Sequence, residues 1–364
     1  MKISRIIIVV VVIAIVAIVG LYAFEVLLAP STTSSSSTWH PAAGYPLELS
    51  GTYGVAGQQC VNSTTYIYCI GGQDANGGPR NEIFSSPSLS SSSDNITGWI
   101  SDSSQYPENI NGQSCVAYST YVYCVGGTYD DSGDDIASSY YAPLSSGVVG
   151  NWSSTTAFPI PVDSQSCVSS SGYIYCVGGN NETDGTNADS VSSTSVYFAQ
   201  LSSSGIGSWT LTTAYPQGVY FPTCFSTSDY VYCIGGADSN DNAVSTDYYA
   251  SLSSSGVGAW TQTTAYPIAA SGQACVISSG YIYCVGGEET ESSYTNAVRY
   301  APVTSGGIGT WKQAPGYPMT IGTTCVLSSG TVYCVGGFDG SSVGNTGAVY
   351  YASPSSLSST SSTG

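Results

Sequence analysis

One heptapeptide recurs six times along this chain of 364 residues. Its copies are YIYCIGG (66–72), YVYCVGG (121–127), YIYCVGG (173–179), YVYCIGG (230–236), YIYCVGG (281–287) and TVYCVGG (331–337). Successive Gly-Gly pairs lie 55, 52, 57, 51 and 50 residues apart. Self-similarity at a fixed period of this length indicates an array of structural repeats, each of which packs against its neighbours. The chain is therefore expected to fold as six copies of one unit.

The repeat unit has the residue pattern of short β-strands. Segments such as Gln-Ser-Cys-Val and Tyr-Ile-Tyr-Cys-Val alternate along the chain and are rich in aromatic and β-branched residues, with Gly, Ser and Asn around them. After residue 30 no stretch shows a sustained helical period. Because a unit of about 50 residues accommodates four strands, the sequence predicts an all-β fold with one propeller blade per repeat.

Two further marks follow most of the Gly-Gly pairs. One is an aromatic pair, such as the YYA at 140–142, and the other is a Trp followed by an aromatic-Pro pair, as in Trp152 with Phe158-Pro159. An apolar strand, Gly-Gly, a later Tyr and then a Trp, at a period near 50, resembles the kelch repeat. The resemblance implies a six-bladed β-propeller over residues 39–352. The Arg and His that many kelch proteins carry between the Trp and the next strand are absent here.

The placement of the six Trp residues predicts how the propeller closes. Five of them follow the Gly-Gly pairs of repeats one to five, whereas repeat six ends after Tyr350-Tyr351 without one. The sixth, Trp39, stands before repeat one, with Tyr45-Pro46 six residues further on. We therefore expect the N-terminal segment to supply the outer strand of the last blade, which would leave no free strand edge at the seam.

Each repeat contains two cysteines that are nine positions apart. If a Ser-Gly turn lies midway, as at 171–172, the two residues face each other on hairpin strands at about 4.5 Å between Cα atoms, within disulfide range. Zinc binding is disfavoured because the spacing is poor and the chain has a single His, and free buried thiols are the remaining alternative. The predicted bridges are Cys60–Cys69, Cys115–Cys124, Cys167–Cys176, Cys224–Cys233, Cys275–Cys284 and Cys325–Cys334.

The N-terminal residues indicate that the protein is located outside the cytoplasm. Ile6 to Phe24 form a nearly pure apolar run, preceded by Lys2 and Arg5, and no further cation occurs before Arg80. Nineteen residues at 1.5 Å each span roughly 28 Å, close to the thickness of a bilayer core. The flanking charges then place residues 1–5 in the cytoplasm, a transmembrane signal-anchor at 6–28 and everything beyond it outside the cell. A cleaved signal peptide is the alternative.

Polar segments flank the predicted propeller on both sides. Residues 29–38 form a Ser/Thr-rich tether and residues 353–364 a Ser/Thr-rich, frayed tail. Four glycosylation sequons begin at Asn95, Asn181, Asn62 and Asn151. Asn95 and Asn181 stand in loop-like contexts, so we prefer them to Asn62, beside a tight hairpin, and to Asn151, next to a Trp.

Charge composition excludes several classes of function. Five Lys/Arg face 23 Asp/Glu, which gives a net charge of −18 and leaves no basic patch for nucleic acid. The single His, His40, excludes most His-based chemistry, including a copper site, and Arg80, Arg299 and Lys312 are too few for an arginine cluster of the sialidase kind. No cofactor and no metal are predicted. With so few cationic partners for its carboxylates, the protein is expected to tolerate acid.

Acidic loops follow the Gly-Gly pairs, at the end of the blades opposite the Ser-Gly hairpins. We expect these loops to form a ligand-binding face, because loops on rigid scaffolds carry function. A Ca²⁺ site is conceivable, but no segment has EF-hand spacing. The candidate residues are Asp130, Asp131, Asp134, Asp184, Asp189, Asp238, Asp241 and Glu288.

The sequence therefore predicts a membrane-anchored, extracellular recognition or envelope module. Its expected ligand is a surface glycan or a protein. The alternative is an exported carbohydrate-active enzyme that uses carboxylates on the loop-rich face, although no catalytic constellation can be identified. A purely structural coat component is the third hypothesis.

Overall fold

A computed structural model describes residues 38–46, 48–49, 52–87, 96, 98–129, 134–181, 192–290, 293–338 and 344–359. These residues belong almost entirely to a unit that runs from Trp39 to Gly364, described here by itself. Within the described ranges, no helix is long and apolar enough to span a bilayer. The predicted signal-anchor, residues 6–28, lies outside these ranges.

The described residues form six antiparallel sheets of four or five strands, one for each sequence repeat. Sheet 1 contains β5 (Gln59–Asn62), β6 (Tyr66–Ile70), β8 (Ile83–Pro87) and β9 (Ile100–Ser101). Sheet 2 contains β11 (Ser114–Tyr118), β12 (Tyr121–Val125), β15 (Ser139–Ser145), β16 (Val148–Val149) and β17 (Ser153–Ser154). Sheet 3 contains β18 (Ser166–Ser170), β19 (Tyr173–Val177), β20 (Val196–Ser202), β21 (Gly205–Ile206) and β22 (Thr210–Leu211).

Sheets 4 to 6 repeat this plan. Sheet 4 contains β23 (Thr223–Ser226), β24 (Tyr230–Ile234), β25 (Tyr248–Ser253), β26 (Gly256–Val257) and β27 (Thr261–Gln262). Sheet 5 contains β28 (Ala274–Ser278), β29 (Tyr281–Val285), β32 (Val298–Thr304), β33 (Gly307–Ile308) and β34 (Lys312–Ala314). Sheet 6 contains β35 (Gly322–Ser328), β36 (Thr331–Phe338), β37 (Asn345–Ala352) and β1 (His40–Pro41).

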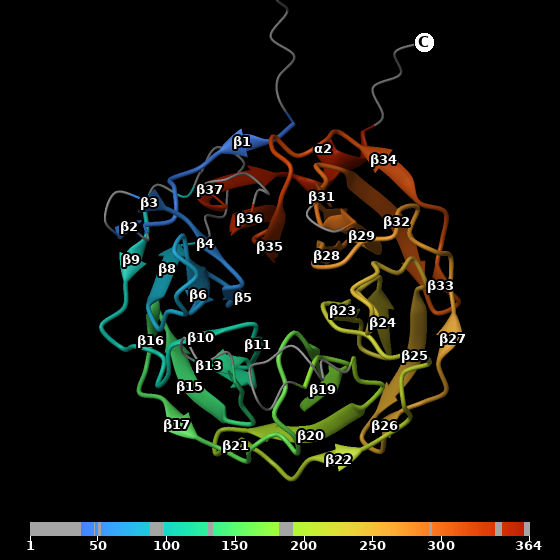
Figure 1. Ribbon diagram of the computed structural model, residues 1–364, viewed down its shortest axis with the longest axis horizontal. Helices are drawn as coiled ribbons and strands as arrows, with labels where there is room; N and C mark the ends of the chain where they lie inside the picture. Colours follow the sequence, from blue (N-terminus) through green and yellow to red (C-terminus); the bar gives the residue numbers. More distant parts are fainter. Residues whose placement is uncertain are drawn as a thin grey trace, which may run out of the picture. The chain divides into compact units, whose positions relative to one another are not determined.

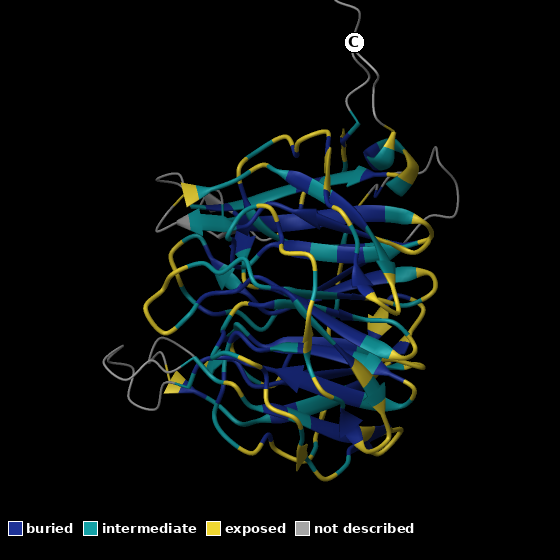
Figure 2. Ribbon diagram, turned by 90° about the vertical axis from the view of Figure 1, so that its right-hand side faces the viewer, coloured by how far each residue is buried: buried dark blue, intermediate teal, exposed yellow. Residues whose placement is uncertain are grey.

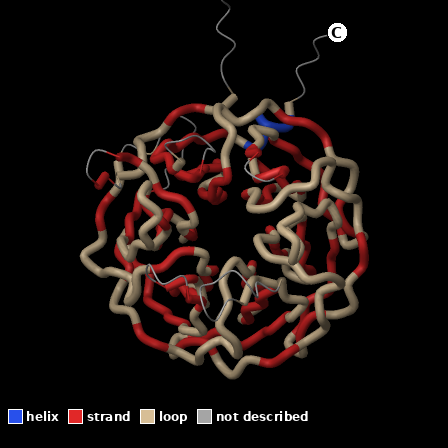
Figure 3. Tube along the Cα trace, viewed as in Figure 1, coloured by secondary structure: helices blue, strands red, loops and turns tan. Residues whose placement is uncertain are grey.

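Shorter pairings occur in the connections, and one helix follows the last strand (Figure 3). These pairings are β2 (Glu48–Leu49) with β3 (Thr52–Tyr53), β4 (Val55–Ala56) with β7 (Gln73–Asp74), β10 (Ile110–Asn111) with β13 (Thr128–Tyr129), β13 with β14 (Asp134–Asp135), and β30 (Glu288–Thr290) with β31 (Ser293–Tyr294). The helix is α2 (Pro354–Ser358).

The six sheets are arranged in a closed, propeller-like ring. The first strand of each sheet contacts the first strand of the next, in the order β5, β11, β18, β23, β28, β35 and back to β5. Figure 1 looks down this ring, with these strands around the centre and β9, β17, β22, β27, β34 and β1 at the rim. The fold is therefore all-β and propeller-like, in agreement with the repeat pattern.

The hairpin register predicted from the cysteine spacing is confirmed. Ser170 pairs with Tyr173 and Cys167 with Cys176, around a turn in which Ser171 and Gly172 both have positive φ. Disulfides join Cys60–Cys69, Cys115–Cys124, Cys167–Cys176, Cys224–Cys233, Cys275–Cys284 and Cys325–Cys334, with Cα–Cα distances of 4.0–4.1 Å. All twelve cysteines of the chain are thus paired within their own repeats.

The hydrophobic core lies between adjacent sheets, where buried residues run along the inner and middle strands (Figure 2). Every seam contains one aromatic residue packed edge-on against a Trp, with ring centroids 4.9–5.0 Å apart. Such T-shaped pairs add to the stabilisation from area burial. The pairs are Tyr45–Trp99, Tyr106–Trp152, Phe158–Trp209, Tyr215–Trp260, Tyr266–Trp311 and Tyr317–Trp39.

A glutamine side chain also bridges four of the seams. It lies two positions before the first cysteine of its repeat, and its Nε2 donates to the carbonyl oxygen that precedes the Gly-Gly pair of the preceding sheet. A Cβ on Gly126 would lie 2.3 Å from the carbonyl oxygen of Val162 and 2.8 Å from Nε2 of Gln165, so the close approach of this backbone explains why glycine occupies the position. The bonds are Gln58 to Val335, Gln113 to Ile70, Gln165 to Val125 and Gln273 to Ile234, at 2.7–3.0 Å.

The two ends of the described chain meet in sheet 6. β1 pairs with β37 through His40 and Tyr351, so the N-terminal segment supplies the outer strand of the last sheet. The segment interpreted as a frayed tail is more ordered than expected, because Ser353 caps α2 and Pro354 occupies its first turn. Leu357, only 1% exposed, packs into the same cluster as Trp39. Residues 360–364 lie outside the described ranges.

Candidate functional site

The inner strands of all six sheets enclose a cavity of about 550 Å³. Its wall comes from the first residues of these strands and from the connections that follow the Gly-Gly pairs, such as Gln73, Glu288 and Tyr294. The cavity therefore opens among the loops where the sequence predicts a ligand-binding face. A volume of several hundred Å³ is typical of sites for small molecules or single sugar units.

The wall of the cavity is about half polar and half apolar, and its polar groups are nearly all uncharged. Amide side chains include Gln73 and Asn111, and hydroxyl groups include Ser166, Thr223 and Thr324. Among the described lining residues there is one carboxylate, Glu288, and no Lys, Arg or His. Amides and hydroxyls both donate and accept hydrogen bonds, so the wall is suited to a neutral, hydroxyl-bearing ligand.

Cysteines also face the cavity. Cys60, Cys167, Cys224, Cys275 and Cys325 line it, and their partners on the second strands are at most 1% exposed. Each of these disulfides thus links an inner strand to the buried second strand of the same sheet. The disulfides make the cavity wall rigid, which lowers the entropic cost of ordering a binding site.

Three aromatic side chains interrupt this polar wall: Phe221, Tyr294 and Phe338. Tyr294 packs edge-on against Phe338, with ring centroids 5.2 Å apart. The hydroxyl of Tyr294 donates to Oε2 of Glu288 at 3.3 Å. Burial and the neighbouring Glu288 charge raise the pKa of Tyr294 to about 12, so the hydroxyl keeps its proton at neutral pH. Glu288 is therefore held in place as a hydrogen-bond acceptor in the wall.

Phe221 differs from the other two aromatic residues because it is unusually exposed. Its side chain is 45% exposed, and its backbone φ is +48°. The ring of Tyr220 lies beside it at a centroid distance of 5.4 Å. The Tyr220 hydroxyl donates to Oδ1 of Asp241, and burial, together with this bond, raises the pKa of Tyr220 well above its usual range.

The structure brings some of the predicted acidic residues to this site and not others. Glu288 lines the cavity, whereas Asp241 accepts a hydrogen bond from Tyr220, the residue next to the cavity residue Phe221. Asp238 instead anchors its own turn by accepting from the backbone N–H groups of Asn240 and Asn242, which lower its pKa. Asp134 is exposed on β14, paired with Tyr129. The predicted residues Asp130, Asp131, Asp184 and Asp189 lie outside the described residues.

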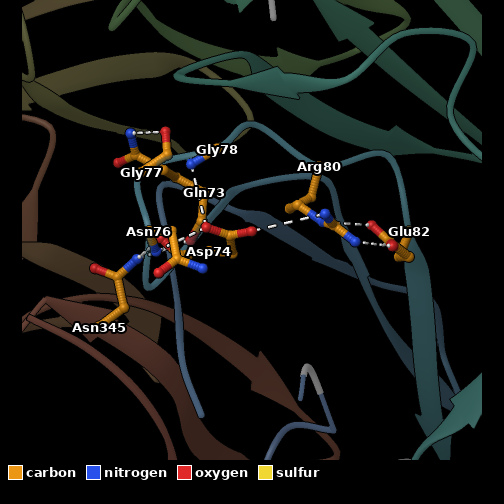
Figure 4. A network of polar contacts seen from close by, with 8 residues as sticks. All are labelled: Gln73, Asp74, Asn76, Gly77, Gly78, Arg80, Glu82 and Asn345. Atoms are coloured by element: carbon orange, nitrogen blue, oxygen red, sulfur yellow. Dashed lines mark hydrogen bonds and ion pairs between the residues drawn. The ribbon is translucent and has the colours of Figure 1, made fainter. Parts of the chain in front are cut away.

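Asp74 on β7 makes the same kind of turn between sheets 1 and 6 (Figure 4). Its Oδ1 accepts from the backbone N–H groups of Asn76 and Gly78, and its Oδ2 lies 3.6 Å from the guanidinium of Arg80. Asn345 donates its side-chain amide to the carbonyl oxygens of Gln73 and Asp74. The network thus ties the last sheet to the first, next to the cavity residue Gln73.

The described sequons differ in accessibility. Asn62 and Asn151 have exposed side chains, whereas Asn181 is half-buried and donates its amide to the carbonyl oxygen of Pro161 at 2.8 Å. Asn95 lies outside the described residues. Among the described sequons, the two that sequence context disfavours are therefore the more exposed, and Asn181, which it favours, is the less exposed.

Sequence reasoning missed the aromatic and amide residues of the cavity. A signal for Phe221 was present, because residues 221–224 (Phe-Pro-Thr-Cys) depart from the Gly-Gln-x-Cys pattern of repeats one, two and five. For Tyr294 and Phe338 no comparable signal exists, since the connections that follow Gly-Gly differ in length and composition from repeat to repeat.

Comparison with known proteins supports the fold. No protein-family model and no curated protein matches this chain. Among solved structures, the chain is similar to one titled "Structure of YjhT", with a TM-score of 0.66 and 12% sequence identity. The similarity covers 85% of this chain and 95% of the YjhT chain. At this level of identity, the similarity shows an all-β, propeller-like fold alone.

Proposed function

We propose that this protein is a membrane-anchored, extracellular, six-bladed propeller of the kelch type that recognises a glycan in its central cavity. The observation that carries the proposal is the chemistry of the cavity wall. Amide and hydroxyl groups from all six sheets surround it, three aromatic rings interrupt it, and Glu288 is the single described carboxylate in it. Saccharides present the complementary combination of hydroxyl groups and apolar ring faces.

A rigid scaffold favours ligand binding over a function that requires a conformational change. Six disulfides and four glutamine bridges hold the inner strands around the cavity. A preformed site binds its ligand without the entropic cost of ordering it. The protein is therefore suited to capture surface glycans as they are presented.

The alternative, an exported carbohydrate-active enzyme, has less support. Most glycoside hydrolases use a pair of carboxylates, one as acid and one as nucleophile or base. Among the described residues, Glu288 has no second carboxylate beside it in the wall. We therefore favour a binding protein over a hydrolase.

The location outside the cytoplasm rests on two features. The apolar run at 6–24 with Lys2 and Arg5 before it has the character of a signal-anchor. Six disulfides agree with an oxidising compartment. Protease added to intact cells should remove the propeller, and carbonate washing should leave it with the membranes. Recovery of the bulk as a soluble species would contradict the anchor.

Binding is tested with the full-length chain on an array of neutral and acidic oligosaccharides. We expect saturable retention of neutral glycans, with competition by the free sugar. A Glu288→Gln variant keeps an acceptor oxygen but loses the charge, so it should weaken binding severalfold without abolishing it. Turnover of a bound oligosaccharide by the wild type, lost in Glu288→Gln, would instead favour the enzyme. Retention of no saccharide at all would refute glycan recognition.

A further inference from the structure

We infer that Phe221 is the platform on which one ring of a neutral saccharide stacks, so that it determines the specificity of the cavity. This inference rests on the proposed function and names the residue that carries it. Its basis is one position of the repeat, three residues before the first cysteine, where the six copies can be compared within a single protein.

At this position the backbone adopts the left-handed conformation in five repeats. Gly57, Gly112 and Gly272 have φ between +61° and +67°, and Ser164 and Phe221 have φ of +54° and +48°. Glycine adopts this conformation without cost, whereas a bulky side chain there is strained by about 1–2 kcal/mol. A bulky aromatic residue has thus replaced glycine in one repeat out of five, against its backbone preference.

Apart from the contact with the ring of Tyr220, the replacement adds no packing to the fold. Phe221 is 45% exposed, lines the cavity and does not belong to the core clusters of sheets 3 and 4. A strained and exposed aromatic residue is unfavourable on both counts. Strained backbone of this kind occurs preferentially in binding and active sites, where the side chain has a task.

The replacement leaves the backbone hydrogen bonds to the neighbouring sheets intact. Phe221 N–H donates to the carbonyl oxygen of Ser164 at 2.8 Å, and Gly272 N–H donates to that of Phe221 at 3.2 Å. The next residue, Pro222, stands where four repeats have the bridging glutamine, so this seam lacks that amide. The seam between sheets 3 and 4 therefore has an apolar surface where other seams have a glutamine bridge, and the two sheets remain in contact.

The surroundings of Phe221 define the ligand. Around the cavity, the next sheet places Ser271 and Gly272 after Phe221. Ser271 exchanges two backbone hydrogen bonds with Glu288. Phe221 and Glu288 therefore line the same cavity, joined through the backbone of Ser271 and Gly272, so that the carboxylate can accept a hydrogen bond from a sugar hydroxyl while the apolar face of the sugar covers the phenyl ring. The described wall contains no cation, so it offers no partner for a carboxylate or sulfate on the sugar.

The test compares four full-length proteins: wild type, Phe221→Gly, Phe221→Leu and Ser279→Gly. Phe221→Gly restores the residue of repeats one, two and five, and Phe221→Leu keeps an apolar side chain without an aromatic face. Ser279 has φ of +50° in the hairpin turn between β28 and β29, so Ser279→Gly changes the same type of backbone far from the cavity. Binding of neutral methyl glycosides and oligosaccharides is measured by calorimetry, together with thermal unfolding.

We expect Phe221→Gly to keep or raise the melting temperature and to lose at least tenfold in affinity. Phe221→Leu should lose several-fold, and Ser279→Gly should bind like the wild type. Equal affinity of wild type and Phe221→Gly would overturn the role of Phe221 and leave glycan recognition standing. Wild-type binding of no neutral saccharide would refute both proposals. Selective binding of an organic ammonium ion, weakened by high salt, would also overturn the inference, because it would assign the ring to a cation.

Discussion

Trp39 packs edge-on against Tyr317, with ring centroids 4.9 Å apart and an angle of 81° between the ring planes. The two residues come from opposite ends of the described chain, and the indole Nε1 also donates to the carbonyl oxygen of Pro315. The five other Trp pairs join segments about 50 residues apart, and this pair repeats their geometry at the seam between sheets 5 and 6 with a Trp that the N-terminal segment supplies. The edge-on contact with Trp that packs neighbouring repeats together therefore also holds the N-terminal segment in the ring.

Replacing Trp39 with alanine should open this seam. Trp39 is 2% exposed, and removal of a buried Trp side chain costs about 3–5 kcal/mol. We expect a lower melting temperature and faster hydrogen exchange in β37, whose outer partner is β1. Trp209→Ala removes the matching residue inside the chain and serves as the control. Unchanged exchange in β37 for Trp39→Ala would mean that the N-terminal segment does not close the ring.

The bridging glutamines should contribute individually to stability. In Gln165→Leu, the buried carbonyl oxygen of Val125 loses its side-chain donor, and leaving such a group unpaired costs about 1–3 kcal/mol. Gln262→Leu changes an exposed glutamine on β27 and should alter the free energy of unfolding by less than about 0.5 kcal/mol. Chemical denaturation distinguishes these outcomes. Equal stabilities of the two variants would show that the bridge contributes nothing measurable.

A double Cys275→Ala, Cys284→Ala variant tests the contribution of one disulfide. The bridge closes a loop of about ten residues, for which chain entropy gives about 2–3 kcal/mol. We therefore expect a lower melting temperature with the other five bridges unchanged in non-reducing peptide maps. A pairing between cysteines of different repeats in those maps would contradict the register described here.

Several features of the fold could be predicted from the sequence because of the repeats. The register around Ser171-Gly172 and the pairing of Cys167 with Cys176 follow from a cysteine spacing that six repeats share, and the position of β1 follows from the Trp that repeat six lacks. The site could not be read in this way, because a binding site is a departure from the repeat. Phe221 became informative once the structure placed it in the cavity, and the helix at Pro354 depends on a single apolar residue, Leu357.

Asp247, which is fully buried at 0% exposure, should make stability depend on pH. Burial raises the pKa of Asp247 from its ordinary 3.8 to about 7, although the backbone N–H of Gly235 donates to its Oδ1 at 3.1 Å. Tyr215 and Tyr266, on which the Asp247 charge acts, have pKa values raised chiefly by burial and stay neutral below pH 8. Asp247 therefore takes up a proton in the folded state between pH 7 and 4, where the unfolded chain does not.

The sign of the effect follows from this uptake. Because the folded state binds the proton more tightly, the fold loses stability as the pH rises through about 7 and regains it on acidification, by up to about 4 kcal/mol. Asp247→Asn keeps an acceptor for Gly235 but has no charge. It should melt at a higher temperature than the wild type at pH 8, and the difference should vanish near pH 4. A constant difference across this range would show that Asp247 does not titrate, and acid tolerance would then have to come from relief of repulsion among the other 22 acidic side chains.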